Sequence, residues 1–406
     1  MSASRSLTEI QEIPSASRTE HVRYAIREIA LLGDQLAREG RRIIPLHIGD
    51  PAAFDFETPP HLIEAVAKAM RDGKNGYAPA LGLGDALAAI RTGAEREGIR
   101  NVQTVFVTYG VSEAADICLT GLVNPGESVL TPCPNYPLYS AILAKLGGCD
   151  VAYRLDESRG WEPDLDDLAS KITSGTRVLV VINPNNPTGS VHSRVTLERV
   201  AELARRHNLV VFSDEIYDKL ILDERPHVTF AALAPDLPVV TFKGLSKNYV
   251  VPGWRVGWVI LSGPEVALRD YTEALHRLVR ARLSGNNPIQ HAIRPALEGP
   301  QDHLPKVIQK LRARRDLTMG WCRQTPRVSC VAPLAAFYAF PKIEIPGPDE
   351  KFVRELLLKT GVVVVHGSGF GPLGAAGHLR IVYLPNEETL RRAYGAITNF
   401  MREQYT

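Results

Sequence analysis

From residue 177 to residue 217 the chain reads RVLVVINPNNPTGSVHSRVTLERVAELARRHNLVVFSDEIY, and the alternation of patterns in this stretch indicates the architecture. The aliphatic residues at 178–182 predict a short buried strand, which ends in a turn rich in Asn, Pro and Gly. Val200, Leu203 and Ala204 then recur at helical spacing, and residues 209–212 predict a second strand. A strand, a helix and a strand in this order predict two parallel strands joined by a crossover helix.

The same alternation extends to both sides of this stretch. Further short β-branched runs predict strands at 105–108, 128–130, 151–155, 239–242 and 256–261. We therefore expect an α/β fold whose large domain, residues 51–294, contains a mostly parallel seven-stranded sheet. Near-continuous apolar strands of this kind are typical of a sheet that helices cover on both faces.

The pattern changes after about residue 262, where helical segments precede a less regular region. The sequence predicts helices at 264–281 and 304–321, a strand at 337–340, a helix at 349–360, strands at 362–366 and 379–383, and a last helix from 386. This region predicts a smaller α/β domain at 295–406. Residues 1–50, with a helix at about 20–39, are expected to contribute to the small domain.

Composition excludes several classes of protein. The 406 residues carry 47 basic and 45 acidic side chains, so a net charge of +2 gives no sign of nucleic-acid binding or of an acidic tail. Five cysteines, without any C-x-x-C pair, do not suggest a disulfide framework or a zinc site, and we expect no metal. No apolar run approaches the ~20 residues of a membrane-spanning helix. The polar start of the chain carries no signal-peptide pattern, so we expect a cytoplasmic protein.

Candidate functional residues lie where predicted strands end, because parallel α/β sheets bind ligands beyond the carboxyl ends of their strands. After the strand that ends at Thr108, Gly110 leads into a helix whose first amides, with the hydroxyl of Ser112, can hold a phosphate. A helix cap by Ser112 is the structural alternative. Asn186 and Asp214 follow two further strands, although a turn asparagine and a helix-capping aspartate are common.

A lysine and an arginine follow the next strand. Lys247 lies in the segment KGLSK at 243–247, and Arg255 lies eight residues later in GWRVG at 253–257. A single lysine is usually a solvated surface cation. This pair, placed beyond a buried strand, is less typical of a surface.

Together these segments resemble the class I/II aminotransferases, the fold-type-I enzymes that use pyridoxal 5′-phosphate (PLP). The resemblance runs from LHIGDP at 46–51 to LRIV at 379–382 and so covers nearly the whole chain. The segments VRYAIR at 22–27 and NPNNPTG at 183–189 are similar to those of the alanine (glutamate–pyruvate) aminotransferase branch. The resemblance implies amino-group transfer between an L-amino acid, alanine or glutamate, and a 2-oxo acid by a ping-pong mechanism.

The resemblance also implies roles for individual residues. Lys247 matches the Schiff-base lysine, Asp214 the partner of the pyridine nitrogen, and Tyr217 and Asn186 the partners of the phenolic oxygen. The remaining cofactor-binding positions are implied to be Val111, Ser112, Ser246 and Arg255 at the phosphate, Tyr136 and Ile216 on the two ring faces, and Tyr77. Tyr77 matches a tyrosine that reaches the phosphate of the neighbouring subunit, so a homodimer with shared sites is expected. A serine that many members have three residues before the lysine is Gly244 here, which removes one phosphate hydroxyl.

Substrate-binding positions follow from the same resemblance. Arg380 matches the clamp for the substrate α-carboxylate, Gly49 would donate an amide to it, and Asn186 is implied to contact substrate as well. Tyr24 and Arg27 lie three residues apart in the segment that covers the site in the alanine branch. Arg27 would pair with the distal carboxylate of glutamate, unless both side chains lie on a solvated helix surface.

Other readings of the sequence remain as alternatives. The stretch GFGPLG at 369–374 formally matches the G-x-G-x-x-G of a dehydrogenase, but we expect a loop there because no helix follows it. Aspartate, aromatic or LL-diaminopimelate specificity, a PLP-dependent carbon–sulfur lyase and a cyclase would use the same cofactor.

Overall fold

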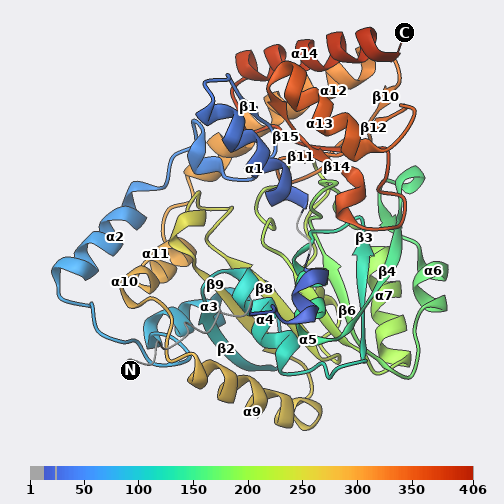
Figure 1. Ribbon diagram of the computed structural model, residues 1–406. Coiled ribbons are helices and arrows are strands. Elements are labelled where there is room, and N and C mark those ends of the chain that lie inside the picture. Colours follow the sequence, from blue (N-terminus) through green and yellow to red (C-terminus); the bar gives the residue numbers. More distant parts are fainter. Residues whose placement is uncertain (1–12, 23–24, 406) are drawn as a thin grey trace, which may run out of the picture.

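The computed structural model describes residues 13–22 and 25–405, and its centre is an eight-stranded sheet (Figure 1). The strand order is β2-β9-β8-β7-β6-β3-β4-β5. The strands are β2 (Val102–Thr108), β3 (Ser128–Cys133), β4 (Cys149–Asp156), β5 (Glu162–Pro163), β6 (Thr176–Ile182), β7 (Val210–Asp214), β8 (Val239–Gly244) and β9 (Gly257–Ser262).

The sheet has one strand more than the sequence predicts. The seven predicted strands are present, and the two-residue β5 pairs antiparallel with the edge strand β4. A strand of two residues is too short to leave a periodic pattern in the sequence. β9 runs antiparallel to both of its neighbours, whereas the five strands from β8 to β4 are mutually parallel.

The interior of the sheet is apolar on both faces. Along β6, Val178, Val180 and Ile182 belong to one buried cluster, and Leu179 and Val181 belong to a second cluster on the other face. Each strand therefore buries successive side chains on opposite sides, which explains its unbroken aliphatic sequence. The helices of this part are α2 (Pro60–Arg71), α3 (Gly84–Arg96), α4 (Val111–Thr120), α5 (Leu138–Leu146), α6 (Leu165–Ser170), α7 (Arg194–Arg206), α8 (Phe230–Leu233), α9 (Glu265–Ala281), α10 (Asn287–Gln290) and α11 (Ile293–Glu298).

A second group of elements lies above the sheet in Figure 1 and consists mainly of C-terminal residues. Its helices are α12 (His303–Gln324), α13 (Asp349–Thr360) and α14 (Glu387–Tyr405). Its short strands are β10 (Val328–Ser329), β11 (Tyr338–Ala339), β12 (Lys342–Ile343), β13 (Val362–Val363), β14 (Val365–His366) and β15 (Leu379–Val382). The run predicted as one strand at 362–366 forms two strands, because β13 and β14 pair with different partners.

An N-terminal segment joins this upper group. α1 (Ala25–Arg38) follows the 3₁₀ turn Ser17–His21, so the regular helix is shorter than the predicted 20–39. The strand β1 (Ile44–Pro45) pairs in parallel with β13, which brings residues from the two ends of the sequence together. Among the described residues, no helix is both long enough and apolar enough to cross a membrane.

Candidate active site

Strand register brings the predicted residues to one edge of the sheet. Ile182 of β6, Asp214 of β7 and Phe242 of β8 are direct neighbours across the three strands. The turn with Asn186, the carboxylate of Asp214 and the loop with Lys247 therefore leave the sheet at the same edge. On either side, β2 leads to Val111 at the start of α4 and β3 leads to Tyr136.

These strand ends form the floor of a cavity of about 570 Å³. Residues of α1, of the segment 47–50 and of β11 and β15 complete its wall. Thirteen residues discussed above line it: Arg27, Gly49, Val111, Ser112, Tyr136, Asn186, Asp214, Ile216, Tyr217, Ser246, Lys247, Arg255 and Arg380.

Two predicted positions are not part of this set. Tyr77 is 83% exposed and does not line the cavity. The loop that carries it is fixed by a 2.8 Å hydrogen bond from the side-chain amide of Asn287 to the carbonyl of Gly76. Tyr24 lies outside the described residues.

Asp214 is a buried carboxylate at the end of β7. Its Oδ1 accepts a hydrogen bond from the amide of Ile216 at 3.3 Å, and its Oδ2 accepts one from the hydroxyl of Tyr139 at 3.2 Å. Burial raises the pKa of Asp214 to about 6, against the opposite effect of these two hydrogen bonds. A cationic ligand atom beside Asp214 would relieve this cost of burial.

Lys247 has the electrostatic properties of a reactive amine. Its Nζ donates a 2.7 Å hydrogen bond to the carbonyl of Gly49. Burial lowers the pKa of Lys247 to about 8; Asp50 opposes the shift, and Arg255 and Arg380 add to it. About a tenth of this amine is therefore neutral and nucleophilic at pH 7, far more than for a lysine with an ordinary pKa.

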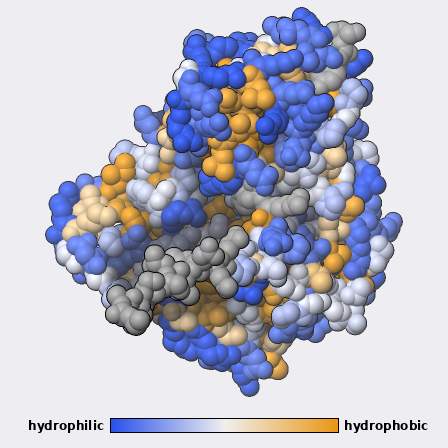
Figure 2. Space-filling view, in the orientation of Figure 1, coloured by the Kyte–Doolittle hydropathy of each residue, from blue (hydrophilic) through white to orange (hydrophobic). Residues whose placement is uncertain are grey.

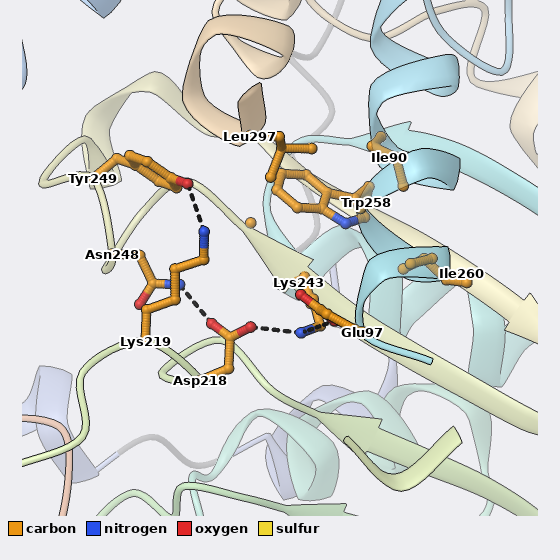
Figure 3. Close-up of a pocket in the computed structure, with 13 residues that line it drawn as sticks. Ile90, Glu97, Asp218, Lys219, Lys243, Asn248, Tyr249, Trp258, Ile260 and Leu297 are labelled. Atoms are coloured by element: carbon orange, nitrogen blue, oxygen red, sulfur yellow. Dashed lines mark hydrogen bonds and ion pairs between the residues drawn. The ribbon is translucent and has the colours of Figure 1, made fainter. Parts of the chain in front are cut away.

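Lys243, four residues earlier, is a buried cation that forms ion pairs with three carboxylates. It points into a separate, enclosed pocket, where Figure 3 shows it beside Asp218 and Glu97. Its Nζ lies 2.5 Å from Asp218, 2.7 Å from Glu97 and 3.3 Å from Glu215. Burial alone would lower the pKa of Lys243, but these carboxylates raise it well above its ordinary value. The two lysines thus have opposite pKa shifts, and Lys247 is the one suited to nucleophilic chemistry.

An anion-binding arrangement lies at the start of α4. Gly110 has φ +81°, and an added Cβ would lie 2.5 Å from Nη2 of Arg255. Arg255 also has a positive φ of 53°, and its guanidinium donates to the carbonyls of Pro252 and Tyr109. Ser112 and Ser246 line the cavity nearby. Backbone amides at a helix start, two hydroxyls and a guanidinium form a set suited to a phosphate.

Gly244 has no room for the side chain that many members of the resembling family carry there. An added Cβ would lie 2.7 Å from the carbonyl oxygen of Val256 and 3.1 Å from Cα of Gly257. Close contact between β8 and β9 therefore explains the glycine. Gly244 is not among the residues that line the cavity.

Arg380 on β15 is buried, with 2% of its surface exposed, and faces the sheet edge from the upper group. Its Nη2 donates to the carbonyl of His47 at 2.5 Å, and its Nη1 donates to Oδ1 of Asn186 at 3.3 Å. The rings of Tyr338 and Phe370 each lie 5.0 Å from its Cζ. Phe370 belongs to the 3₁₀ turn Gly367–Phe370, so the glycine-rich stretch is a loop in contact with the site and does not start an α-helix.

The sequence did not predict three polar or aromatic side chains that bear on the chemistry of the site: His47, Tyr338 and Tyr139. His47 and Tyr338 line the cavity, and Tyr139 hydrogen-bonds Asp214 from helix α5. Burial, with Arg380 and Arg27 nearby, lowers the pKa of His47 to about 4. Each of the three is a single aromatic or imidazole side chain within an apolar segment, where the local pattern does not distinguish a site residue from a core residue.

The cavity fits the group that the resemblance implies. A buried carboxylate suits a protonated ring nitrogen, and a neutral lysine amine suits an aldehyde. The absence of a side chain at Gly110 lets the guanidinium of Arg255 lie against the start of α4, where a phosphate would bind, while Tyr136 and Ile216 supply apolar surface for a ring. Asp214, Lys247, Tyr136 and Ile216 all line the same cavity, and Gly110 directly precedes Val111 in its wall.

Comparison with known proteins agrees with this chemistry. Residues 41–397 match the family model "Aminotransferase class I and II". The chain is 40% identical to the glutamate-pyruvate aminotransferase AlaA of Haemophilus influenzae, over 96% of this chain and 98% of that protein. It is 39% identical to an alanine aminotransferase of Mycobacterium tuberculosis, over 95% and 92% of the two chains. An alanine aminotransferase structure from Pyrococcus furiosus superposes with a TM-score of 0.93 at 40% identity, covering 96% of this chain and all of the other.

Proposed function

The chain belongs to the class I and II aminotransferase family, and on this basis we propose that it transfers amino groups between alanine or glutamate and the 2-oxo acids pyruvate and 2-oxoglutarate. The protein is a PLP-dependent aminotransferase. The nearly full-length relatives named above support the choice of substrates. The presence of two arginines, Arg380 and Arg27, in one cavity carries the proposal, because glutamate has two carboxylates.

The chain's own residues would hold the cofactor at three points. Asp214 would pair with the ring nitrogen, Tyr217 and Asn186 would hydrogen-bond the phenolic oxygen, and the cluster around Arg255 would hold the phosphate. Tyr136 and Ile216 would enclose the ring. When bound, the cofactor supplies a ring that accepts the electron pair released when the substrate Cα–H bond breaks.

Lys247 would act both as the covalent anchor and as the acid–base group. Its Nζ, once released from the cofactor, would take the proton from the substrate Cα and later return it. The lowered pKa suits this role, because a neutral amine is needed to accept the proton. Two cations nearby, Arg255 and Arg380, help to keep the amine neutral.

Substrate orientation would depend on Arg380. Its planar guanidinium offers two parallel donors to the α-carboxylate, and the rings of Tyr338 and Phe370 hold it in place. The amide of Gly49 would add a further donor. Arg27 is exposed at the mouth of the cavity, on α1, and would bind the second carboxylate of glutamate or 2-oxoglutarate.

The experiment compares single half-reactions of Arg27→Ala with glutamate and with alanine. We expect glutamate and 2-oxoglutarate to lose roughly 1.5–3 kcal/mol of transition-state stabilisation, which is about 10- to 100-fold in rate, with alanine little changed. Arg38→Ala is the matched control, since Arg38 lies on the same helix but does not line the cavity. Equal losses for both substrates, or none, would contradict the role of Arg27.

The same half-reactions separate the alternatives. An aminotransferase converts its bound cofactor to the amine form with amino acid alone, whereas a carbon–sulfur lyase releases pyruvate and ammonia and keeps PLP. A panel of aspartate, aromatic and diaminopimelate donors tests the other specificities. Faster turnover with any of these donors than with alanine and glutamate would overturn the proposed substrates.

We further propose a homodimer whose sites are shared. Tyr77 would reach the phosphate in the partner's site, which accounts for its projection away from its own cavity. Figure 2 shows apolar side chains among hydrophilic ones at the end of the molecule where α2 lies. Ile63 and Met70 of α2 are half exposed, so this end offers apolar surface to a second copy.

The five cysteines are free thiols, as suits the proposed cytoplasmic location.

A further inference from the structure

Tyr338 contacts both Tyr217, a proposed cofactor-binding residue, and Arg380, a proposed substrate-binding residue. It lies on β11, is 2% exposed, and its hydroxyl is 2.8 Å from the hydroxyl of Tyr217. The two rings meet edge to face, with centroids 5.7 Å apart. The guanidinium of Arg380 lies over the other part of its surface, 5.0 Å from the ring centroid.

The hydroxyl of Tyr338 also fills a space that a side chain would otherwise occupy. An added Cβ at Gly49 would lie 2.3 Å from this hydroxyl oxygen. The carbonyl of Gly49 in turn accepts the hydrogen bond from Lys247. The position of Tyr338 is thus fixed by Gly49, Tyr217 and Arg380, each of which faces the cavity.

The direction of the hydrogen bond between the two tyrosines depends on what lies beside Tyr217. In the pair alone, either hydroxyl can donate. A negatively charged ligand oxygen beside Tyr217 accepts only, so Tyr217 must give it its single proton. The oxygen of Tyr217 is then free to accept, and the hydroxyl of Tyr338, 2.8 Å away, is placed to donate to it. Burial raises the pKa of Tyr338 to about 12, so this donor keeps its proton at neutral pH.

We infer that Tyr338 is a positioning residue that directs the proton of Tyr217 toward the phenolic oxygen of the cofactor and supports Arg380 with its ring. This inference rests on the proposed function and deepens it, because it joins cofactor binding and substrate binding through one side chain. The hydroxyl of Tyr338 acts on cofactor binding through its hydrogen bond with Tyr217. The ring of Tyr338 acts on substrate binding through its cation–π contact with Arg380.

The first test uses Tyr338→Phe and the pH titration of the visible absorption band of bound PLP. Loss of the donor weakens the hydrogen bond from Tyr217 and so destabilises the negative oxygen. The midpoint of the titration should rise by about 0.5–1 pH unit, as expected for one hydrogen bond between neutral groups. Tyr383→Phe is the matched control, because it removes another buried hydroxyl, bonded to the carbonyl of Ala336, that does not line the cavity.

The second test separates the ring from the hydroxyl. Tyr338→Phe keeps the ring and should leave the affinity for propionate, a simple carboxylate, within about twofold of wild type. Tyr338→Leu removes the ring and should weaken propionate binding by roughly 3- to 10-fold, the range for a cation–π contact. Equal propionate affinity in both variants would overturn the role of the ring.

A third readout needs no cofactor. Gly49→Ala should destabilise the apoprotein to heat, and the loss should be smaller in a Tyr338→Phe background, because the hydroxyl at 2.3 Å is then absent. Equal losses in both backgrounds would contradict the close contact. If wild type binds PLP but the band midpoint is the same in Tyr338→Phe, the inference fails and the proposed function stands. If wild type binds no PLP, the proposed function itself fails.

Discussion

At the scale of single residues, the site depends on a difference in pKa between two lysines of the same segment. Lys247 is partly buried and Lys243 is buried, and they lie four residues apart, yet their pKa values shift in opposite directions. Three carboxylates around Lys243 account for the difference. The chemistry of Lys247 therefore comes from its surroundings and not from its residue type.

We predict that a small acylating reagent will label Lys247 of the apoprotein with a midpoint near pH 8. A pKa of about 8 means that the reactive neutral amine appears about 2.5 pH units lower than in a free lysine. Mass spectrometry of peptides after labelling at several pH values measures this directly. Lys243 is the internal control and should stay unlabelled, while a midpoint near 10 for Lys247 would contradict its lowered pKa.

Asp214 gives a prediction about stability. Its pKa in the folded apoprotein is about 6, above the ordinary value of 3.8, so its effect on stability is unfavourable once it ionises. The apoprotein should lose about 2 kcal/mol from this group as the pH rises from 4 to 7. Asp214→Asn avoids this loss, so its apoprotein should gain stability over wild type as the pH rises, although its turnover falls by about 10²-fold or more.

Urea unfolding of both apoproteins at pH 4, 6 and 8 measures the difference. Asp236→Asn is the control: Asp236 is bonded by Arg205 on the surface, its pKa is lowered, and no gain is expected from its removal. A gain of Asp214→Asn that does not change with pH would show that burial does not raise the pKa of this carboxylate.

At the scale of elements, the start of α4 depends on one glycine. Gly110 has a backbone conformation that side chains rarely adopt, and its neighbour in space is the guanidinium of Arg255. An alanine there would bring strain of about 1–3 kcal/mol and displace Arg255. The helix itself would remain, since the rest of α4 is buried against the sheet.

We predict that Gly110→Ala will bind PLP at least about tenfold more weakly and will bind pyridoxal, which has no phosphate, nearly as well as wild type does. Fluorescence titration of the apoprotein with each ligand gives both affinities. Gly126→Ala is the matched control, because Gly126 also has a positive φ but open space around it. Equal losses for both ligands would place the defect outside the phosphate site.

Elements also show what the sequence can predict. The seven strands and the long helices α9, α12 and α13 follow from periodicity, because each buries a regular set of side chains. The brief strand β5 and the division of 362–366 into β13 and β14 depend on pairing partners that lie far away in sequence. Asp214 and Lys247 were predicted because they lie at or just beyond the ends of predicted strands and match motifs of the family, whereas Tyr338 was missed because its role depends on contacts made across the whole chain.

At the scale of the whole molecule, the proposed sharing of sites predicts complementation between subunits. Tyr77→Ala and Lys247→Ala chains should each be impaired alone. A mixed dimer should regain one intact site, which combines Lys247 of the Tyr77→Ala chain with Tyr77 of the Lys247→Ala chain. Activity after joint refolding, compared with each variant refolded alone, measures this. Wild type mixed with a chain that carries both changes is the control, because each of its sites then has one defect.

Recovery to about a quarter of the wild-type activity is the expected result, because half of the randomly paired dimers are mixed and each has one intact site. No recovery above the sum of the separate variants would contradict a contribution of Tyr77 to the partner's site.

The contact between Arg380 and His47 has a consequence for the synthesis of the protein. These residues lie 333 positions apart in the sequence. Strand β1 likewise cannot pair until its partner β13 has been synthesised. On a ribosome that adds about 5–20 residues per second, the strands around Asp214 can fold many seconds before the arginine has been made. We therefore expect a stage of synthesis in which the sheet is complete and the cleft above it has no second wall. We expect closure of the cleft to be among the last events of its biogenesis, so that free cofactor can reach the sheet edge before the second wall is in place.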